Sequence, residues 1–550
     1  MQAAYLIIFG VAWFIFSYFW YGRLIERKVL QIDDKHITPS NEINDGVDYV
    51  PTKPSILFGH HFSSIAGAGP IVGPIIAYAL FGWLPAMIWV LVGSVFMGAV
   101  HDYSALVISI RNKGVSIVEI TEKAVSNRAR VIFAVFVWLT LMLVQAVFAD
   151  LTAKTLAEDP TIVIPTFGLI LIAIIFGFFV YRRGLNIVIG TIMGLVLLGL
   201  FIYFGKQYPI SQSADFWLFI TIIYSFVAAT LPVWLLLQPR DYLSMYLLII
   251  GLLLALVGLV VENPTINGPA FLGFQSEKGP LFPILFITVA CGAISGFHSL
   301  VSSGTSAKQL RRESEGRIVA FGSMLTEGLL ALVVIVMISG VLVWKTGEEI
   351  ILPDQYFFQD LYSKSANIVF GNALGLSIDS LGIPLSSGIS FGILMLNAFI
   401  LTTLDTSARL NRYVFTETIG VKYGGIFRNR YFATAISLVL AYILCLFGGY
   451  KLIWPVFGAS NQLIATLALF VITSYFLGFK SAKWFTLIPA IMMLLITESA
   501  LAYGIVFNYL PNQHWHLIII SAILLLLGLL IAIEVFKKIA DKTIEMEMNP

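Results

Sequence analysis

The sequence predicts an all-α integral membrane protein that crosses the lipid bilayer about fifteen times. Of its 550 residues, 58% are hydrophobic and only 12% are charged, whereas about a quarter of a soluble protein is charged. A water-soluble fold cannot bury so large an apolar fraction, so lipid is the expected solvent. The other two observations are the lengths of the apolar segments and the placement of the positive charges.

A helix that spans the bilayer needs roughly 20 apolar residues. Fifteen segments meet this requirement: 3–21, 57–79, 83–110, 131–157, 161–181, 185–205, 216–237, 242–261, 281–305, 318–344, 385–408, 431–449, 452–479, 484–508 and 515–537. The first has no positive residue before it and is expected to be a retained helix, not a signal peptide. The connection 345–384 is expected to hold a short interfacial helix. The two cysteines, both in apolar runs, predict neither a disulfide nor a metal site.

Lysine and arginine gather on one side of this topology. With the amino terminus outside and the carboxyl terminus inside, nearly all of the 33 Lys and Arg residues fall in cytoplasmic segments, as the positive-inside rule requires. The outside keeps only these lysines: Lys154, Lys206, Lys278, Lys345, Lys364 and Lys451. Because one missed or added helix would mix the two groups, the charges favour fifteen spans.

The second segment cannot be a regular helix. The run GHHFSSIAGAGPIVGP, residues 59–74, holds four glycines and two prolines in sixteen residues. The seventh segment has a second candidate break at 229–232, and alternation makes these two segments run in opposite directions. Paired broken helices in opposed halves indicate an inverted-repeat transporter. This pattern predicts helix 1 and a loop over 1–56, repeats over 57–215 and 216–415, and accessory helices over 416–550.

Five motifs, which span helices 2 to 13, carry a family resemblance. They are FGHHFSSIAGAGPIVGP (58–74), GAVHDYSALVIS (98–109), GAISGFHSLVSSGTSAKQL (292–310), LTTLDTSARLNRY (401–413) and WPVFGASNQLIA (454–465). The chain resembles the carbon starvation protein A (CstA) family of bacterial membrane transporters. It departs from the family pattern at His101, where glutamine is expected, and it is shorter than the larger members.

The resemblance implies ion-coupled uptake of a scarce carbon source across the bacterial cytoplasmic membrane. Peptides are the substrate usually proposed for the family, and some relatives resemble pyruvate transporters, so sodium-coupled pyruvate transport is the alternative. The family is grouped with the amino acid–polyamine–organocation transporters, which share a five-plus-five inverted repeat.

The substrate is expected at the break in the second segment. An unwound stretch near the bilayer midplane frees backbone polar groups that a ligand, ion or water must satisfy. The half-helix that follows points its positive end at the site, which suits a carboxylate. Close helix packing through small residues is the alternative explanation of the motif. The predicted substrate-binding residues are Gly67, Ala68, Gly69, Pro70, Thr230 and Pro232.

Ionisable residues within spans are candidates for ion coupling, and histidine exchanges a proton near neutral pH. The candidates are His60, His61, His101, Asp102, His298, Ser302, Ser303, Thr305, Glu327, Thr402, Thr403 and Asp405. Proton coupling through His61 and Asp102 is preferred. Sodium coupling through Ser302, Ser303, Thr403 and segment 2 carbonyls is the rival. Alternatively, the histidines brace helix ends, and the hydroxyls bond to carbonyls of the preceding turn. Four arginines, Arg311, Arg312, Arg409 and Arg412, are expected to anchor helix ends at the inner surface.

Two other function classes compete with transport. An intramembrane metal-dependent hydrolase would need a zinc motif such as H-E-x-x-H, which the sequence lacks. A nutrient sensor would bind without flux. We expect no enzyme activity, cofactor, metal or nucleic-acid partner; H⁺ or Na⁺ is the expected coupling ion. The sequence leaves the substrate, the coupling ion and the oligomeric state open.

Overall fold

The protein is a bundle of long apolar helices. The computed structural model describes residues 1–46, 48–232, 234–345, 356–447, 450–478 and 483–548. Strands are limited, in this described part, to β1 (Gln275–Ser276) and β2 (Gly279–Pro280), which pair antiparallel with Gln275 opposite Pro280. The large side chains that face outward are mostly hydrophobic on α1 and α11, as expected for helices surrounded by lipid.

The helices of the first half are α1 (Ala3–Phe19), α2 (Tyr21–Leu24), α3 (Pro39–Glu42), α4 (Pro54–Ile65), α5 (Gly69–Phe81), α6 (Trp83–Gly93), α7 (Ala99–Arg111), α8 (Ile117–Ala124), α9 (Asn127–Glu158), α10 (Val163–Gly177), α11 (Ile187–Gln207), α12 (Ala214–Thr230) and α13 (Leu237–Glu262). Those of the second half are α14 (Leu281–Thr288), α15 (Gly296–Gly304), α16 (Ser323–Val341), α17 (Phe358–Lys364), α18 (Ala366–Asp379), α19 (Leu385–Phe415), α20 (Val421–Tyr423), α21 (Arg430–Phe447), α22 (Tyr450–Tyr475), α23 (Lys483–Tyr503) and α24 (Trp515–Met548).

Each of the fifteen predicted spans coincides with helical structure. In the described residues, twelve helices are long and apolar enough to cross a membrane, and the bent pair α4–α5 would make thirteen. The other two predicted spans are α12, which is 17 residues long, and the interrupted pair α14–α15. The number fifteen therefore stays a prediction, while the helical membrane architecture is confirmed. The connection 345–384 holds α17 and α18, so the expected short helix is present.

The predicted break in the second segment is confirmed. Helix α4 ends at Ile65, α5 begins at Gly69, and the two axes differ by 41°. Pro70 lies in the first turn of α5, where a missing N–H costs no helical hydrogen bond. Because only residues 66–68 separate the two half-helices, they can together form one interrupted span.

The second break is not where the sequence predicted it. Leu231 is extended, with φ −72° and ψ 154°, because the residue before a proline is disfavoured in the helical region. Pro232 therefore ends α12 and does not interrupt a continuing span. The second interrupted span is instead α14–α15, with non-helical backbone over 289–295. In the predicted order of fifteen spans it comes seven spans after α4–α5, so that order would make the two interrupted segments antiparallel.

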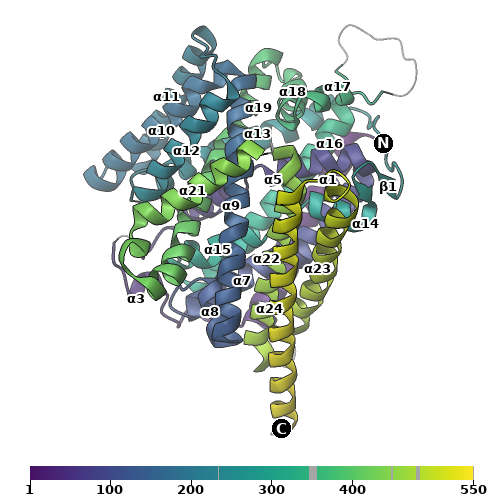
Figure 1. The fold of residues 1–550 in the computed structure, drawn as a ribbon. Helices are drawn as coiled ribbons and strands as arrows, with labels where there is room; N and C mark the ends of the chain where they lie inside the picture. The colour runs from purple at the N-terminus through teal and green to yellow at the C-terminus, as the bar shows by residue number, and fades with distance from the viewer. Residues whose placement is uncertain (47, 233, 346–355, 448–449, 479–482, 549–550) are drawn as a thin grey trace.

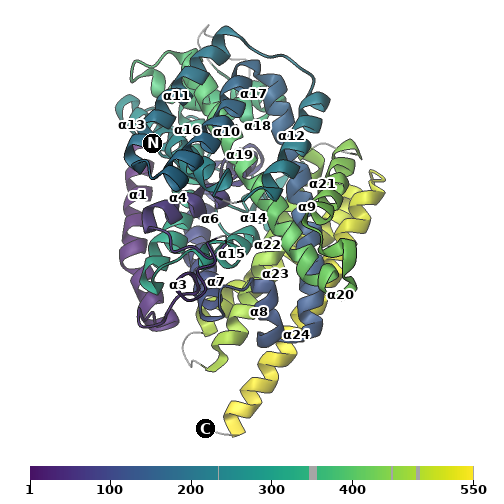
Figure 2. The same ribbon diagram turned by 90° about the vertical axis from the view of Figure 1, so that its left-hand side faces the viewer.

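The two faces of the bundle are distinguished by the chain ends. The carboxyl end of α24 projects below the bundle, and the amino terminus lies in the upper half (Figure 1). We name these sides the C-terminal face and the N-terminal face. Helices α10 to α12 form one flank, and α1 lies at the opposite side (Figures 1 and 2). Helix α22, predicted to be accessory, has every residue of its most apolar stretch buried, so it belongs to the packed interior.

Candidate functional site at the crossing of two broken helices

The two breaks lie against each other inside the bundle. A Cβ atom added to Gly69 would lie 2.4 Å from the Cβ of Cys291, and one added to Gly292 would lie 3.6 Å from the Cα of Pro70. A Cβ on Gly67 would lie 2.5 Å from the Oγ1 of Thr403 in α19. Glycine at 67 and 69 therefore leaves room for the side chains of Thr403 and Cys291, which a Cβ at either position would displace.

Distant side chains satisfy much of the backbone that the second break frees. The Trp89 indole in α6 donates to the carbonyl of Val289 at 3.0 Å. At the start of α15, the backbone N–H of Phe297 donates to the Asn461 side chain at 2.9 Å. The Asn461 amide also donates to the Ser295 hydroxyl at 2.9 Å. The break 289–295 is thus built by tertiary contacts from α6 and α22.

The first break is less fully satisfied. No side chain caps the amino terminus of α5 at its Ala68 position. The Thr403 hydroxyl beside Gly67 is 3% exposed and has no hydrogen-bond partner in the described structure. A positive helix end and a buried hydroxyl therefore meet at Gly67 to Pro70, and this combination can receive an anionic or hydrogen-bonding ligand.

A cluster of two histidines and two carboxylates lies immediately beyond the second break. His298, in the first turn of α15, places its Nδ1 atom 2.9 Å from Asp102 of α7 and its Nε2 atom 3.3 Å from Glu327 of α16. The Nδ1 atom of His101 lies 2.7 Å from the other Asp102 oxygen. All four side chains have zero exposed area. The structure thus brings together four of the predicted coupling residues.

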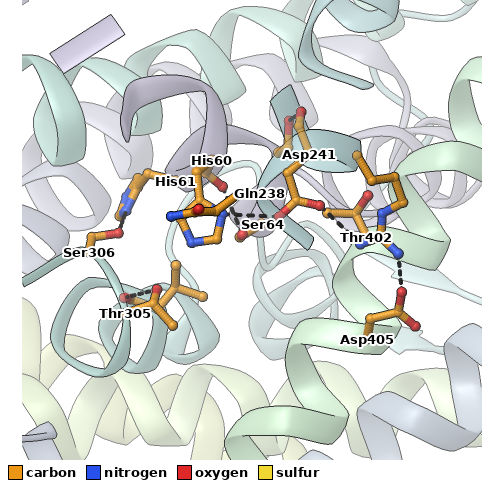
Figure 3. A network of polar contacts seen from close by, with 12 residues as sticks. His60, His61, Ser64, Gln238, Asp241, Thr305, Ser306, Thr402 and Asp405 are labelled. Atoms are coloured by element: carbon orange, nitrogen blue, oxygen red, sulfur yellow. Dashed lines mark hydrogen bonds and ion pairs between the residues drawn. The ribbon is translucent and has the colours of Figure 1, made fainter. Parts of the chain in front are cut away.

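The two histidines of α4, His60 and His61, point to different partners (Figure 3). The Nδ1 atom of His61 lies 2.7 Å from the hydroxyl of Ser306. The Nδ1 atom of His60 lies 3.1 Å from Asp241 of α13. Adjacent residues on a helix face about 100° apart, so α4 contributes one histidine to each of two neighbouring polar groups.

Arg240 links α4, α13 and α19 in the second of these groups. Its guanidinium donates to Asp241 at 3.0 Å and also pairs with Asp405 and with the hydroxyl of Tyr224. The Tyr224 hydroxyl donates to Asp405 at 2.6 Å. Arg240 is 2% exposed, and both carboxylates are fully buried. The network Tyr224–Asp405–Arg240–Asp241–His60 therefore joins four helices, α4, α12, α13 and α19, through buried charge.

Most of the predicted hydroxyl cluster is occupied by bonds within the helices. Three hydroxyls each donate to the carbonyl four residues before them, those of Ser303, Thr305 and Thr402. This is the alternative to ion binding that the sequence left open for such residues. Ser302 and Thr403 are buried without a partner in the described structure. The hydroxyls available to a ligand or ion are therefore fewer than the sequence suggests.

Contrary to the sequence prediction, Thr230 and Pro232 do not belong to a second broken helix that faces the first break. Thr230 donates to the carbonyls of Phe226 and Val227 within α12. The end of α12 is held by arginines: Arg409 donates to the carbonyls of Ala228 and Leu231, and Arg412 to that of Ala229. Both arginines are less than a tenth exposed. They were expected to anchor helix ends at the inner surface. They do bind the carbonyls at the end of α12, where cations suit the unpaired carbonyls, and the position of this end at the inner surface stays a prediction.

Sequence reasoning missed Arg240, Asp241, Tyr224 and Asn461. Arg240 was counted among the loop charges because it lies between two apolar segments. The signal that could have revealed it is the pair Arg240–Asp241 at the start of an otherwise apolar helix. Asn461 lies within the family motif WPVFGASNQLIA. Its role as a cap of α15 depends on a contact with Phe297, which lies 164 residues away in the sequence.

Cavities open on both faces, and the crossing of the breaks lies between them. One of about 420 Å³ on the C-terminal face is lined by Tyr49, Glu119, Lys308 and neighbours. One of about 290 Å³ on the N-terminal face is lined by residues of α5, α14 and α22. Residues 66–70 at the first break are buried. The described residues form no group of His, Cys, Asp and Glu that could hold a metal ion.

The sequence was then compared with known families. A profile of the family described as "Carbon starvation protein CstA" matches residues 2–367 and 361–500. The chain belongs to the CstA family. It is 32% identical to the peptide transporter CstA of Bacillus subtilis, with both chains covered completely. It is 33% identical to the peptide transporter CstA of Campylobacter jejuni, covering 93% of this chain and 81% of that one.

A further relative of this CstA family member supports the transporter class, and two solved structures show its fold. It is 32% identical to the pyruvate/proton symporter BtsT of Escherichia coli, over 91% of this chain and 81% of that one. Its fold resembles a manganese transporter of Eremococcus coleocola, with 11% identity, a TM-score of 0.54 and coverage of 91% and 99%. It also resembles MhsT in complex with L-phenylalanine, with 14% identity, a TM-score of 0.50 and coverage of 88% and 98%. The chain is therefore a membrane transporter and not an enzyme.

Proposed function

We propose that this protein imports a small carboxylate-bearing solute, a short peptide or a short organic acid such as pyruvate, together with protons across the bacterial cytoplasmic membrane. The observation that carries the proposal is the buried cluster His101–Asp102–His298–Glu327 beside the second break. Relatives named peptide transporter and pyruvate/proton symporter support both solute classes. The positive-inside rule supports placing the C-terminal face on the cytoplasmic side of the membrane.

Charge balance is the physical reason for the coupling. A buried group of acids and histidines cannot change its net charge without a large cost unless another charge compensates. A carboxylate arriving at the crossing of the breaks brings one negative charge close to His298. A proton taken up by the cluster restores neutrality, so solute and proton are expected to bind together and to leave together.

The surroundings of the first break favour protons over sodium. A sodium site there would use Thr403 and carbonyls of α4, the rival hypothesis. The two buried carboxylates near α4, Asp241 and Asp405, already pair with Arg240. This pairing leaves less of their charge to attract a sodium ion, whereas the histidine cluster offers protons a separate site.

We propose a revised boundary for the second repeat. Because the second broken span is α14–α15, the second repeat would begin near Leu281 and not at 216. Counting five spans from there gives α14–α15, α16, α19, α21 and α22, which takes in the fully buried α22. The first repeat would begin with α4–α5, as the sequence predicts.

Uptake by sealed proteoliposomes tests the function. Radiolabelled pyruvate and dialanine should accumulate in sodium-free vesicles when the outside is acidic. Asp102→Asn and Glu327→Gln should each lose this drive while keeping solute exchange without a gradient. Glu498→Gln is the matched control. Glu498 is also a carboxylate within an apolar helix, but it has no partner among the described residues and lies in α23, outside the cluster. Uptake that ignores pH and stops without sodium would reject proton coupling and support Thr403 and Ser302 as a sodium site. Binding without flux would indicate the sensor alternative.

A further inference from the structure

A cavity of about 290 Å³ on the N-terminal face is walled by the adjoining halves of both broken helices. Ile76 and Leu80 of α5 and Ile284, Ile287 and Thr288 of α14 line it. Thr288 is the last residue of α14, directly before the second break. The cavity therefore ends where the crossing of the breaks begins, and it has the apolar walls common in small-molecule sites.

Two buried hydrogen-bond donors on the opposite wall have no acceptor. Trp454 and Tyr450, both on α22, line the cavity and are 5% and 3% exposed. The Trp454 indole N–H has no hydrogen-bond partner in the described structure, and the Tyr450 hydroxyl has no acceptor for its proton. Buried tryptophan N–H and tyrosine O–H groups usually find a partner, so these two donors indicate a ligand with acceptor oxygens.

The rim of the cavity carries one charge of each sign. Glu277 and Lys278 stand exposed in the turn between β1 and β2. Neither sign dominates this entrance, so the rim does not repel a solute that carries a carboxylate, with or without an ammonium group. The specific contacts must come from the donors on α22, deeper in the cavity.

We propose that this cavity is an outer recognition site, where Trp454 and Tyr450 bind a carboxylate or carbonyl oxygen of the solute before it reaches the breaks. The inference rests on the proposed function, because the bound solute is the transported one. The solute's apolar part lies against α5 and α14, so its binding favours the arrangement of these two half-helices that admits it. The site is distinct from the one at Gly67 to Pro70.

Conservative removal of the donors tests the site. Trp454→Phe keeps the ring and deletes the N–H, and Tyr450→Phe deletes the hydroxyl. Each should raise the KM for zero-gradient exchange of pyruvate or dialanine about tenfold, which corresponds to about 1.4 kcal/mol, the order of one hydrogen bond to a charged group. The maximal rate should change little. Trp515→Phe is the control, because Trp515 is 60% exposed at the start of α24.

Equilibrium binding of the same two probes to purified protein gives an independent result. Wild-type protein should bind two molecules, and Trp454→Phe should bind one in the same concentration range. Unchanged KM and stoichiometry in both variants, with active wild-type protein, would overturn the outer site and leave the proposed function standing. No binding or uptake of either probe by wild-type protein would overturn both. Tyr450→Phe keeps the test decisive if Trp454→Phe does not fold.

Discussion

Arg240 shows how a charged side chain is tolerated deep in a membrane protein. Its guanidinium offers five donors in a planar fork, and it uses them on Asp241, Asp405 and Tyr224. Each carboxylate therefore has a positive partner without contact with solvent, although one guanidinium is shared between the two. Removing the arginine would leave two buried negative charges, whereas removing an exposed arginine would leave its partner in water.

We expect Arg240→Gln to destabilise the protein by about 3–5 kcal/mol, the usual cost of breaking a buried ion pair from one side. The thermal unfolding midpoint of the purified protein in detergent measures it. Arg128→Gln is the control, since Arg128 is 72% exposed and its ion pair with Glu534 spans 3.6 Å, so its loss should cost less than about 1 kcal/mol. Adding Asp405→Asn to Arg240→Gln should recover part of the loss. Equal midpoints for the two arginine variants would contradict this account.

At the residue scale, the sequence identified the ionisable groups better than their partners. His101, Asp102, His298 and Glu327 were all named, because an ionisable residue inside an apolar segment stands out. Which of them touch could not be predicted, since α7, α15 and α16 are brought together only by the fold. Arg240 was misplaced because the boundary of α13 lies before it, and segment boundaries follow from local capping and packing.

At the scale of elements, the two breaks differ in what encodes them. The first is encoded by residues at the break itself, Gly67, Gly69 and Pro70, and was predicted from them. The second, over 289–295, has one glycine and no proline, so its propensities do not distinguish it from a helix. It is stabilised from a distance by Trp89 and Asn461. Conversely, Pro232 gave a strong local signal that turned out to mark a helix end.

The contact between the breaks predicts a suppressor pair. Gly69→Ala should abolish solute exchange, because the new Cβ would lie 2.4 Å from that of Cys291 and force the half-helices apart. Cys291→Gly in the same chain removes the obstructing atoms and should restore part of the exchange rate. Gly199→Ala on α11 is the control, since a Cβ there meets nothing within 4 Å, and it should keep full activity. Normal exchange by Gly69→Ala would show that the breaks do not pack as described during transport.

At the scale of the whole molecule, composition alone was sufficient for the class of fold. Apolar helices surrounded by lipid must satisfy their own backbone, so fifteen apolar segments could only be helices. The order and rough bounds of these helices were predictable for the same reason. The proposed start of the second repeat, near Leu281, was not predictable, because it depends on a break without a local signature.

The orientation of the molecule gives its own test. Reporter fusions after Asn112 and Met548 should give a cytoplasmic signal, and one after Lys206 an external signal. The physical reason is the retention of lysine and arginine on the cytoplasmic side. A fusion after Glu262 should give an external signal and serves as a second point on that side. An external signal at Asn112 or Met548, or a cytoplasmic one at Lys206, would contradict both the orientation and the number of spans between them.

The seal at the crossing of the breaks has an electrical consequence. Cavities enter from both faces, and residues 66–70 between them are buried. Solvent in the cavities would hold each face near the voltage of its own compartment, so most of the membrane voltage falls across the sealed layer, not across the full bilayer thickness. An elementary charge that crosses this layer gains about 2.3 kcal/mol per 100 mV. A net charge that crosses only this layer therefore experiences nearly the whole membrane voltage, whereas a carboxylate that crosses with one proton carries no net charge and experiences none of it.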